Sequence, residues 1–562
     1  MSVVAPSAED RPRAINGHAP DVFSHDGTVP MRQFRDDDEV DFAIIGTGCG
    51  GGVLAAKLAE AGHSVVAMDA GPFWRPLSDF ASDEEEQEKL YWLDPRITEG
   101  DDPIECGSNN SGRAVGGSTV HFQMVALRFR PEWFKARSHL GYGVDWPVDW
   151  REMWQAYAEA EQASAISGPM RYPWGPKRGR YPYRAHQVNA AGEVLIRSAE
   201  ALGVDWAPTP LATVSAPRGR SPPCVYRGMC KIGCTTNAKQ SVLITWIPRA
   251  LAAGAEVRDL AMAGRVETDR AGRRATGIHY HRGGAWRFQR ARHVVVAGYS
   301  IETPRLLLNS ATPAHPAGLA NSSGTVGRYL MVHLNDAVWS TFDDEIRWYK
   351  GPPSMACCEH FNYFDDIPGG GFARDFDGGY AFMSQGPLPG DFATTLVTST
   401  GLFGEALREK MMLYNRMAGL KMVGETMPRA ENRVRLADET DALGLPRARV
   451  SFSMGENEKR MKAHARRFMG RMLEEAGGYD LIETGSTAHL MGGCRMGHDR
   501  DSSVTDADGR TWDVPNLWIC DGSLMPTGGG VNPSMTIMAN AIRIAGRIAA
   551  LAARGDLEGE RA

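Results

Sequence analysis

The sequence predicts an α/β protein of two domains, one of which is assembled from segments far apart in the chain. Three observations predict this fold class. A strand, a glycine-rich turn, a helix and a second strand follow one another over residues 41–71. A strand, a second glycine-rich turn and a long apolar helix follow over residues 517–553. The chain has 562 residues, more than one hydrophobic core normally supports.

The first unit has the features of a dinucleotide site. Residues 42–45 are apolar and β-prone, as a buried parallel strand requires, and residues 53–61 form a helix with an apolar stripe. The turn GTGCGG at 46–51 lets the backbone approach a pyrophosphate, which then lies at the positive end of the helix. Asp69 ends the second strand, 64–68, where a ribose hydroxyl needs an acceptor. This unit does not distinguish NAD from FAD.

Composition excludes several classes of protein. The formal net charge of -6 gives no basis for nucleic-acid binding. No run of about eighteen apolar residues is present, so we expect no transmembrane segment. Residues 1–39 lack a signal-peptide core and predict an arm that is draped on the surface or partly disordered. The expected location is cytoplasmic, or periplasmic if a partner subunit carries the chain out.

The middle of the chain alternates between helix and strand signals. We expect helices at 150–163 and 456–476, and a helix at 303–310 with Pro304 as its first residue. Strands are expected with a turn over 255–276, and at 292–297, 432–436 and 447–452. Short aromatic segments broken by Gly and Pro over 342–403 predict antiparallel strands.

A second glycine-rich patch, GRAVGGSTVHF, occupies residues 112–122. Two glycines followed by small hydroxyl residues give a backbone that can pass close to a planar ligand. A tight turn before a strand explains the same spacing equally well.

With these pieces in place, the chain resembles the glucose-methanol-choline (GMC) flavoprotein oxidoreductases over about residues 40–555. Six motifs follow the family's order: GTGCGG, GRAVGGSTVHF, GCTTNAKQS, VVVAGYSIETPRLLLNS, HLMGGCRMG and DGSLMPTGGGVNPSMTI. The resemblance implies FAD rather than NAD, and oxidation of an alcohol by hydride transfer to flavin N5. It also implies a Rossmann-type FAD-binding domain and a substrate domain that combines an antiparallel sheet with helices. We assign 40–130, 224–330 and 480–562 to the first domain, and 131–223 and 331–479 to the second.

The resemblance also assigns residues to the cofactor. These are Gly46, Gly48, Gly51, Asp69, Gly116, Gly117, Ser118, Thr119, His121, Asp521, Asn532 and Pro533. His121 lies four residues after Gly117, where some members of the family have a histidine covalently joined to the flavin and others have a histidine without the bond. Both alternatives are open for this chain.

His489 and Asn532 match the family's two catalytic positions. A neutral imidazole can accept the hydroxyl proton, since its ordinary pKa is near 6.5. Asn532 would orient that hydroxyl, and Asn before Pro533 also makes a good N-cap for the helix that follows.

Cys224, Cys230 and Cys234 have metal-like spacing. Similar spacing holds a [3Fe-4S] cluster in some dehydrogenases of the family, whereas the flanking sequence resembles relatives in which these cysteines are structural. A cluster would pass electrons to a cytochrome subunit, and we favour the structural role.

The sequence thus predicts FAD-dependent oxidation of a sugar, polyol or other small alcohol, with quinone, cytochrome or oxygen as acceptor. A small or cytochrome subunit is a further partner implied by the relatives. Two other readings are a redox-neutral flavoprotein lyase of the same fold and, with less support, a NAD-binding module. Trp348, Tyr349, His360 and Phe361 either line the substrate pocket or pack in the core.

Overall fold

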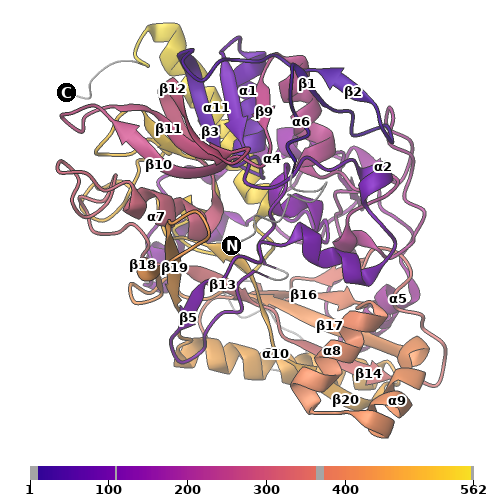
Figure 1. The fold of residues 1–562 in the computed structure, drawn as a ribbon. Helices are drawn as coiled ribbons and strands as arrows, with labels where there is room; N and C mark the ends of the chain where they lie inside the picture. Colours follow the sequence, from indigo (N-terminus) through magenta and orange to yellow (C-terminus); the bar gives the residue numbers. More distant parts are fainter. Residues whose placement is uncertain (1–10, 108–109, 363–372, 558–562) are drawn as a thin grey trace.

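The computed structural model describes residues 11–107, 110–362 and 373–557. Two large sheets define two lobes, with the shorter strands and the helices packed around them (Figure 1). This arrangement confirms the predicted α/β class with an added antiparallel sheet.

The first sheet has seven strands and is built from distant segments of the chain. Its central strands are parallel, and β10 and β11 form an antiparallel extension of β12. The order is β10-β11-β12-β3-β4-β9, with β22 also beside β12. The strands are β3 Val40–Ile45, β4 Val65–Met68, β9 Glu256–Arg258, β10 Met262–Thr268, β11 Ala275–Arg282, β12 Ala285–Val296 and β22 Leu517–Ile519. The first and last predicted units therefore share one sheet.

Apolar helices pack together beside this sheet. α1 contacts both α6 and α11, and α11 also packs against α4. Their bounds are α1 Gly51–Glu60, α4 Trp150–Ala163, α6 Val242–Ala252 and α11 Ser534–Arg554. By length and composition, α11 is the one described helix apolar enough to cross a membrane, but 61% of its apolar window is buried inside the protein. The apolar surface of α11 is thus largely used in the core.

The second sheet has eight strands, most of them antiparallel, and α5 and α10 pack on it. Its main order is β20-β14-β17-β16-β15-β8, and β13 joins β17 to β21. The strands are β8 Ala207–Pro208, β13 Met331–Leu334, β14 Ala337–Thr341, β15 Ala356–Cys358, β16 Tyr380–Gln385, β17 Met417–Gly424, β20 Tyr479–Thr484 and β21 Thr487–Met491. The helices are α5 Ala190–Leu202 and α10 Glu456–Glu475.

A small third sheet and several short elements complete the fold. The third sheet has the order β18-β19-β5 and packs on α7. The remaining elements are β1 His18–Pro20, β2 Thr28–Pro30, β5 Ile97–Glu99, β6 Ser167–Gly168, β7 Tyr183–Arg184, β18 Arg433–Thr440, β19 Pro446–Ser451, α2 Pro76–Asp79, α3 Ala136–Leu140, α7 Tyr299–Asn309, α8 Pro389–Thr400 and α9 Gly404–Met412.

Two expectations about local structure are wrong. The helix expected at 303–310 begins earlier, at Tyr299, and Pro304 lies inside it rather than at its first position. The backbone N–H of Tyr299 donates to the carboxylate of Asp521. The start of this helix is therefore stabilised by a residue that lies far away in the sequence. The aromatic region 342–403 contains strands β15 and β16, but residues 389–400 form α8 with Pro389 in its first turn. Residues 363–372 lie outside the described part.

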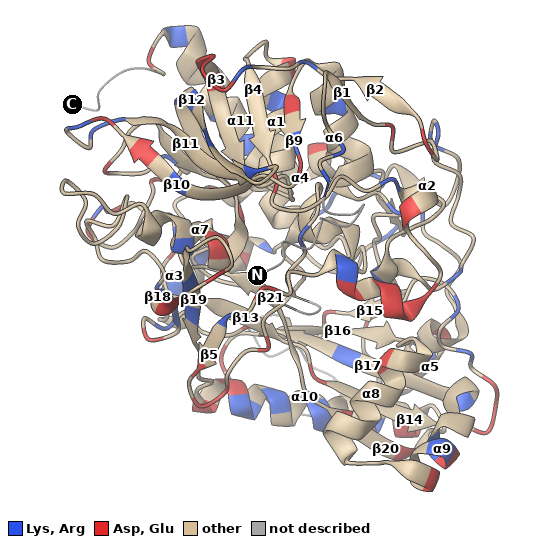
Figure 2. Cartoon of the chain, viewed as in Figure 1, with Lys and Arg blue, Asp and Glu red and all other residues tan. Residues whose placement is uncertain are grey.

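The described part of the N-terminal arm, residues 11–39, is draped over the first lobe. β1 and β2 pair as a hairpin, and the backbone N–H groups of Arg13 and Ala14 donate to the carboxylate of Asp259. Figure 2 shows basic and acidic residues mixed over both lobes, in keeping with the small net charge.

The domain boundaries themselves stay predictions. The strand pairing supports the assembly of the first domain from distant segments, but it places β20 and β21 on the second sheet. A boundary after Met491 fits this pairing better than one at residue 480.

Candidate active site

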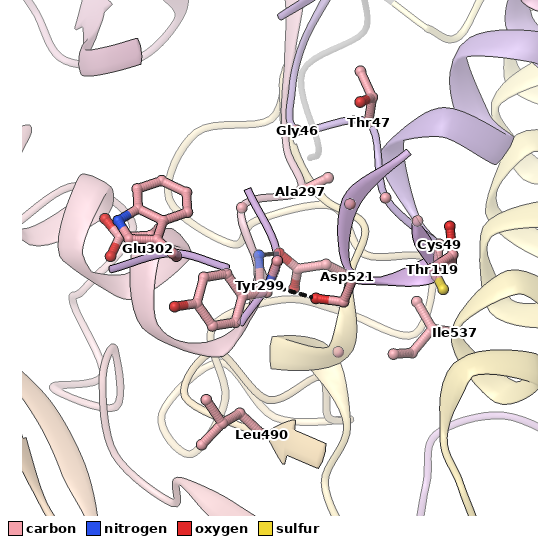
Figure 3. A pocket seen from close by; sticks show the side chains of 18 of the residues that line it. Gly46, Thr47, Cys49, Thr119, Ala297, Tyr299, Glu302, Leu490, Asp521 and Ile537 are labelled. Carbon is pink, nitrogen blue, oxygen red and sulfur yellow. Dashed lines mark hydrogen bonds between the residues drawn. The ribbon is translucent and has the colours of Figure 1, made fainter. Parts of the chain in front are cut away.

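A cavity of about 280 Å³ opens where the parallel strands of the first sheet end. Ile45, Met68 and Val296, the last residues of β3, β4 and β12, line it, and His489 and Lys421 line it from the second sheet. Ligands of α/β proteins bind at the carboxyl ends of parallel strands, so this is the place where the fold predicts a site. Figure 3 shows part of the lining.

The first glycine turn is packed too closely for side chains. Gly46 has φ +92°, and a Cβ on it would lie 2.2 Å from the carbonyl oxygen of Ala297. A Cβ on Gly50 would lie 1.7 Å from the carbonyl oxygen of Cys520. Gly46, Gly48 and Gly50 line the cavity, whereas the predicted Gly51 lies behind them at the start of α1. The turn thus offers bare backbone to a ligand.

Thr47 connects this turn to Asp69 and to the second glycine segment, and no pattern in the sequence singled it out. Its hydroxyl donates to Asp69 Oδ2 at 2.6 Å and accepts from the backbone N–H of Gly116 at 3.0 Å. Asp69 also accepts from the N–H of Gly71 and lines the cavity at the end of β4, and its predicted contact with a ribose stays a prediction. Burial raises the pKa of Asp69 to about 6.

The second glycine patch forms a short 3₁₀ helix, Gly117–Val120, rather than a turn into a strand. Gly116 and Gly117 have φ values of +96° and +58°, and a Cβ on Gly117 would lie 2.7 Å from the Cα of Gly48. The two glycine segments therefore pack against each other. Gly117, Ser118 and Thr119 line the cavity, while Gly116 lies just outside its lining.

His121 follows this helix and faces the same cavity. The residue is 4% exposed, and its Nε2 atom has no hydrogen-bond partner among the described residues. Burial, with a smaller effect from Lys239 and Lys231, lowers the pKa of His121 to about 3. The imidazole is therefore neutral, with a ring nitrogen left to interact with a ligand.

Asp521, at the end of β22, organises the other wall (Figure 3). Its carboxylate accepts hydrogen bonds from the backbone N–H of Tyr299 at 2.8 Å and from the hydroxyl of Thr303 at 2.5 Å. The other oxygen accepts from the N–H of Ser523 at 2.8 Å. Burial raises the pKa of Asp521. Asp521 thus lines the cavity and also fixes the start of α7, and its predicted contact with the cofactor stays a prediction.

The two predicted catalytic residues meet in the cavity. His489 on β21 and Asn532 before α11 both line it, and His489 Nε2 lies 3.1 Å from Asn532 Nδ2. Asn532 is not the N-cap of α11, because that position is taken by Pro533. The amide is turned toward His489 instead, and its Oδ1 atom has no hydrogen-bond partner in the described parts of the chain.

His333 on β13 fixes the protonation of His489, and no motif in the sequence indicated it. Its Nε2 lies 2.7 Å from the carbonyl oxygen of Gly529, and its Nδ1 lies 3.0 Å from Nδ1 of His489. A carbonyl only accepts, so His333 carries its proton on Nε2 and accepts at Nδ1. His489 therefore donates from Nδ1 and has its lone pair on Nε2.

Burial keeps both histidines neutral. It lowers the pKa of His333 to about 4. The pKa of His489 lies well below its ordinary value because of burial and, to a smaller extent, the neighbouring His333 and Lys421. The imidazole of His489 is therefore uncharged at neutral pH, and its Nε2 atom is an acceptor.

The remaining sequence expectations concern cysteines and pocket aromatics. Cys224 and Cys234 pack against a small apolar cluster. In the described residues, no group of three His, Cys, Asp or Glu side chains is arranged to hold a metal ion. Trp348, Tyr349, His360 and Phe361 are not among the cavity residues; Trp348 and Phe361 pack in the aromatic core instead.

The cavity fits FAD on the chain's own residues. Two glycine segments expose backbone that a Cβ would block, an acid ends β4, and two buried polar atoms, His121 Nε2 and Asn532 Oδ1, have no partner among the described residues. Gly46, Gly48 and Asp69 would hold the adenosine end, and residues 117–121 would lie beside the flavin.

Known proteins resemble the chain along most of its length. Family models described as GMC oxidoreductase match residues 107–335 and 428–541. The 2-methyl-1,2-propanediol dehydrogenase of Mycolicibacterium austroafricanum is 33% identical, with 90% of this chain and 94% of that protein covered. The large subunit of fructose dehydrogenase from Gluconobacter japonicus is 29% identical, with 90% and 97% covered.

A solved structure supports the fold. Formate oxidase of Aspergillus oryzae RIB40 superimposes with a TM-score of 0.67 at 15% identity, covering 93% of this chain and all of that one. The sequence relatives and the family models together establish the identity: the protein is an FAD-binding oxidoreductase of the GMC family.

Proposed function

We propose that the protein oxidises a small alcohol, with His489 as the base and Asn532 as the group that orients the hydroxyl. The observation that supports this most directly is the unprotonated Nε2 of His489, which accepts from the Asn532 amide where both side chains line the cavity. Dehydrogenases and oxidases among the relatives support the same reaction class.

Several residues of the chain take part in removing the hydroxyl proton. Asn532 holds the substrate oxygen near His489, and His489 Nε2 accepts the hydroxyl proton as the carbonyl forms. His333 then stabilises the imidazolium by accepting from Nδ1, and Gly529 holds His333 in place. FAD, when bound, supplies N5 as the acceptor of the hydride from the substrate carbon.

An anaerobic substrate screen tests this proposal. The holoenzyme is mixed with sugars, polyols and aromatic alcohols without oxygen, and flavin absorbance is followed. Bleaching by at least one alcohol is expected. A protein that stays yellow with every alcohol but catalyses a redox-neutral cleavage would instead support the lyase alternative.

Adding oxygen, a quinone or cytochrome c after bleaching identifies the electron acceptor. The fructose dehydrogenase relative is a large subunit, so co-purification with a smaller subunit is part of the same experiment.

Two cofactor questions have direct tests. The buried Nε2 of His121 supports a place beside the flavin with or without a covalent bond. Acid precipitation distinguishes them, because bound flavin stays in the pellet and free flavin enters the supernatant. Iron analysis of the intact protein tests the cluster at Cys224, Cys230 and Cys234.

We expect activity to have no acid limb near pH 6.5. The pKa of His489 is lowered by burial, so the base stays neutral as the pH falls through the ordinary histidine range. Lys421 lines the same cavity with a pKa of about 7, so the test is made in Lys421→Met. In that variant the rate of flavin reduction by an uncharged alcohol should be constant between pH 7.5 and roughly 5.5. Neighbouring His333, with a pKa of about 4, titrates below this range. An inflection near pH 6.5 would contradict the assignment.

Replacing His333 should slow flavin reduction by roughly ten- to a hundredfold, since a buried N–H of His489 loses its acceptor. His333→Leu is the test variant, and His333→Gln, whose amide oxygen can accept, should recover part of the rate. The pH profile of His333→Leu should also change, because the imidazolium formed in the reaction loses its partner. Equal rates in both variants, with wild-type pH dependence, would indicate a purely structural role.

A further inference from the structure

We propose that the alcohol substrate carries a carboxylate, which Lys421 binds inside the cavity. This inference rests on the proposed alcohol oxidation and adds the chemical class of the substrate.

Lys421 lines the cavity from the second sheet. It is on β17, between β14 and β16 in the eight-stranded sheet, and it lines the same cavity as His489 and Asn532. The residue is 7% exposed. Its Nζ donates to Oε1 of Gln123, and no ion pair to Lys421 exists within the described residues. The amine of Lys421 is thus buried at the cavity wall with one neutral hydrogen-bond partner among the described residues.

Among the described residues, no acidic side chain forms an ion pair with the ammonium of Lys421. Lys231 is the charged side chain that lowers the pKa of Lys421, and Lys231 is itself paired with Asp391. Burial and this neighbouring cation lower the pKa of Lys421 to about 7. A carboxylate bound beside Nζ would favour the charged amine and remove the cost of a buried unpaired ammonium.

The acids that line the cavity are already committed to other partners. Asp69 is bound by Thr47 and Gly71, and Asp521 by Tyr299, Thr303 and Ser523. Glu302 is held by Arg96 and Arg305. These three carboxylates follow strands of the first sheet or lie on α7. Among the described residues that line the cavity beside His489 and Asn532, the charged side chain is therefore Lys421, and the others are uncharged polar groups.

The neutral neighbours suit a carboxylate. Gln123 accepts from Lys421 through Oε1, which leaves its NH₂ group to donate. Asn335, whose Nδ2 donates to Ser486 Oγ and has a second N–H, also lines the cavity. One carboxylate oxygen can therefore accept from the ammonium of Lys421, and the other can accept from an amide N–H. A cationic substrate could not accept either hydrogen bond. Hydroxycarboxylates, including sugar acids, are the substrate class that this geometry favours.

The test compares alcohols that differ only in charge. The holoenzyme is assayed anaerobically with 4-(hydroxymethyl)benzoate, its uncharged amide 4-(hydroxymethyl)benzamide, and 4-(aminomethyl)benzyl alcohol, and then with glycerate and glyceramide. We expect kcat/KM to be at least about tenfold higher for each carboxylate than for its amide, as a charge-assisted hydrogen bond provides. Lys421→Met should abolish this ratio, and Lys421→Arg should retain it. Lys459→Met, on the exposed face of α10, is the control and should leave the ratio unchanged.

The outcomes separate this inference from the proposed function. Oxidation of uncharged alcohols in preference to every carboxylate would overturn the inference and leave alcohol oxidation standing. Equal losses for carboxylate and amide in Lys421→Met would also overturn it, since Lys421 would then act on His489 or on folding. If no alcohol bleaches the flavin, both proposals fail. Should Lys421→Met not fold, the wild-type carboxylate-to-amide ratio decides alone.

Discussion

His489→Gln should reduce the rate of flavin reduction by about 10²- to 10⁴-fold, the contribution usual for a general base. Glutamine is close in size to histidine and can still contact Asn532, but it cannot accept a proton at neutral pH. The measurement is stopped-flow absorbance of the anaerobic holoenzyme with the best alcohol from the screen. The flavin spectrum and FAD content should stay close to wild type, because the substitution removes the imidazole and leaves the residues that would hold FAD unchanged.

A matched control is a buried histidine on a helix that packs on the second sheet. His464 on α10 is also buried, has a pKa lowered to about 4 by burial, and hydrogen-bonds Tyr380 at 3.0 Å, but it is not among the cavity residues. His464→Gln should therefore leave flavin reduction per bound FAD unchanged. A His489→Gln enzyme within about threefold of wild type would remove His489 from the role of base.

Gly50→Ala should prevent stable FAD binding and destabilise the first lobe by at least about 3 kcal/mol. The added Cβ would lie 1.7 Å from the carbonyl oxygen of Cys520, so either the start of α1 or the segment after β22 must move. Both carry cavity residues. Retained FAD after gel filtration and the apparent melting temperature are the measurements.

The control for this variant is a glycine with free space. A Cβ on Gly546, an exposed position within α11, meets nothing within 4 Å. Gly546→Ala should keep its FAD and gain roughly 0.5–1 kcal/mol, since alanine is the better helix former. If Gly50→Ala binds FAD as wild type does, the close approach of the turn to β22 is not required.

Local patterns in the sequence predicted the elements that depend on local chemistry. The strand, glycine turn and helix at 41–61 were readable because the apolar period and the glycines stand next to each other. The helix at 303–310 was misplaced for the converse reason. Pro304 suggested a start, but the contacts of Asp521 with Tyr299 and Thr303 start the helix earlier, and Asp521 is more than two hundred residues away.

The candidate site shows the same division. The sequence named His489 and Asn532 from their motifs, and the structure brings them within hydrogen-bond distance. It did not indicate Thr47, His333 or Lys421, because each acts through a partner on another strand or segment. Asn532 was also expected to cap α11, a local role that its contact with His489 replaces.

By itself, the sequence determined the family motifs and predicted a dinucleotide-binding turn and two candidate catalytic side chains, because these depend on short spacings along the chain. Only the tertiary structure decided which ring nitrogen of His489 carries the hydrogen and which is left as an acceptor. That choice comes from β13 pairing with β21, which brings His333 between His489 and the carbonyl of Gly529. The same folding encloses Lys421 without an acidic partner among the described residues, and burial is what turns an ordinary lysine into a candidate for substrate recognition.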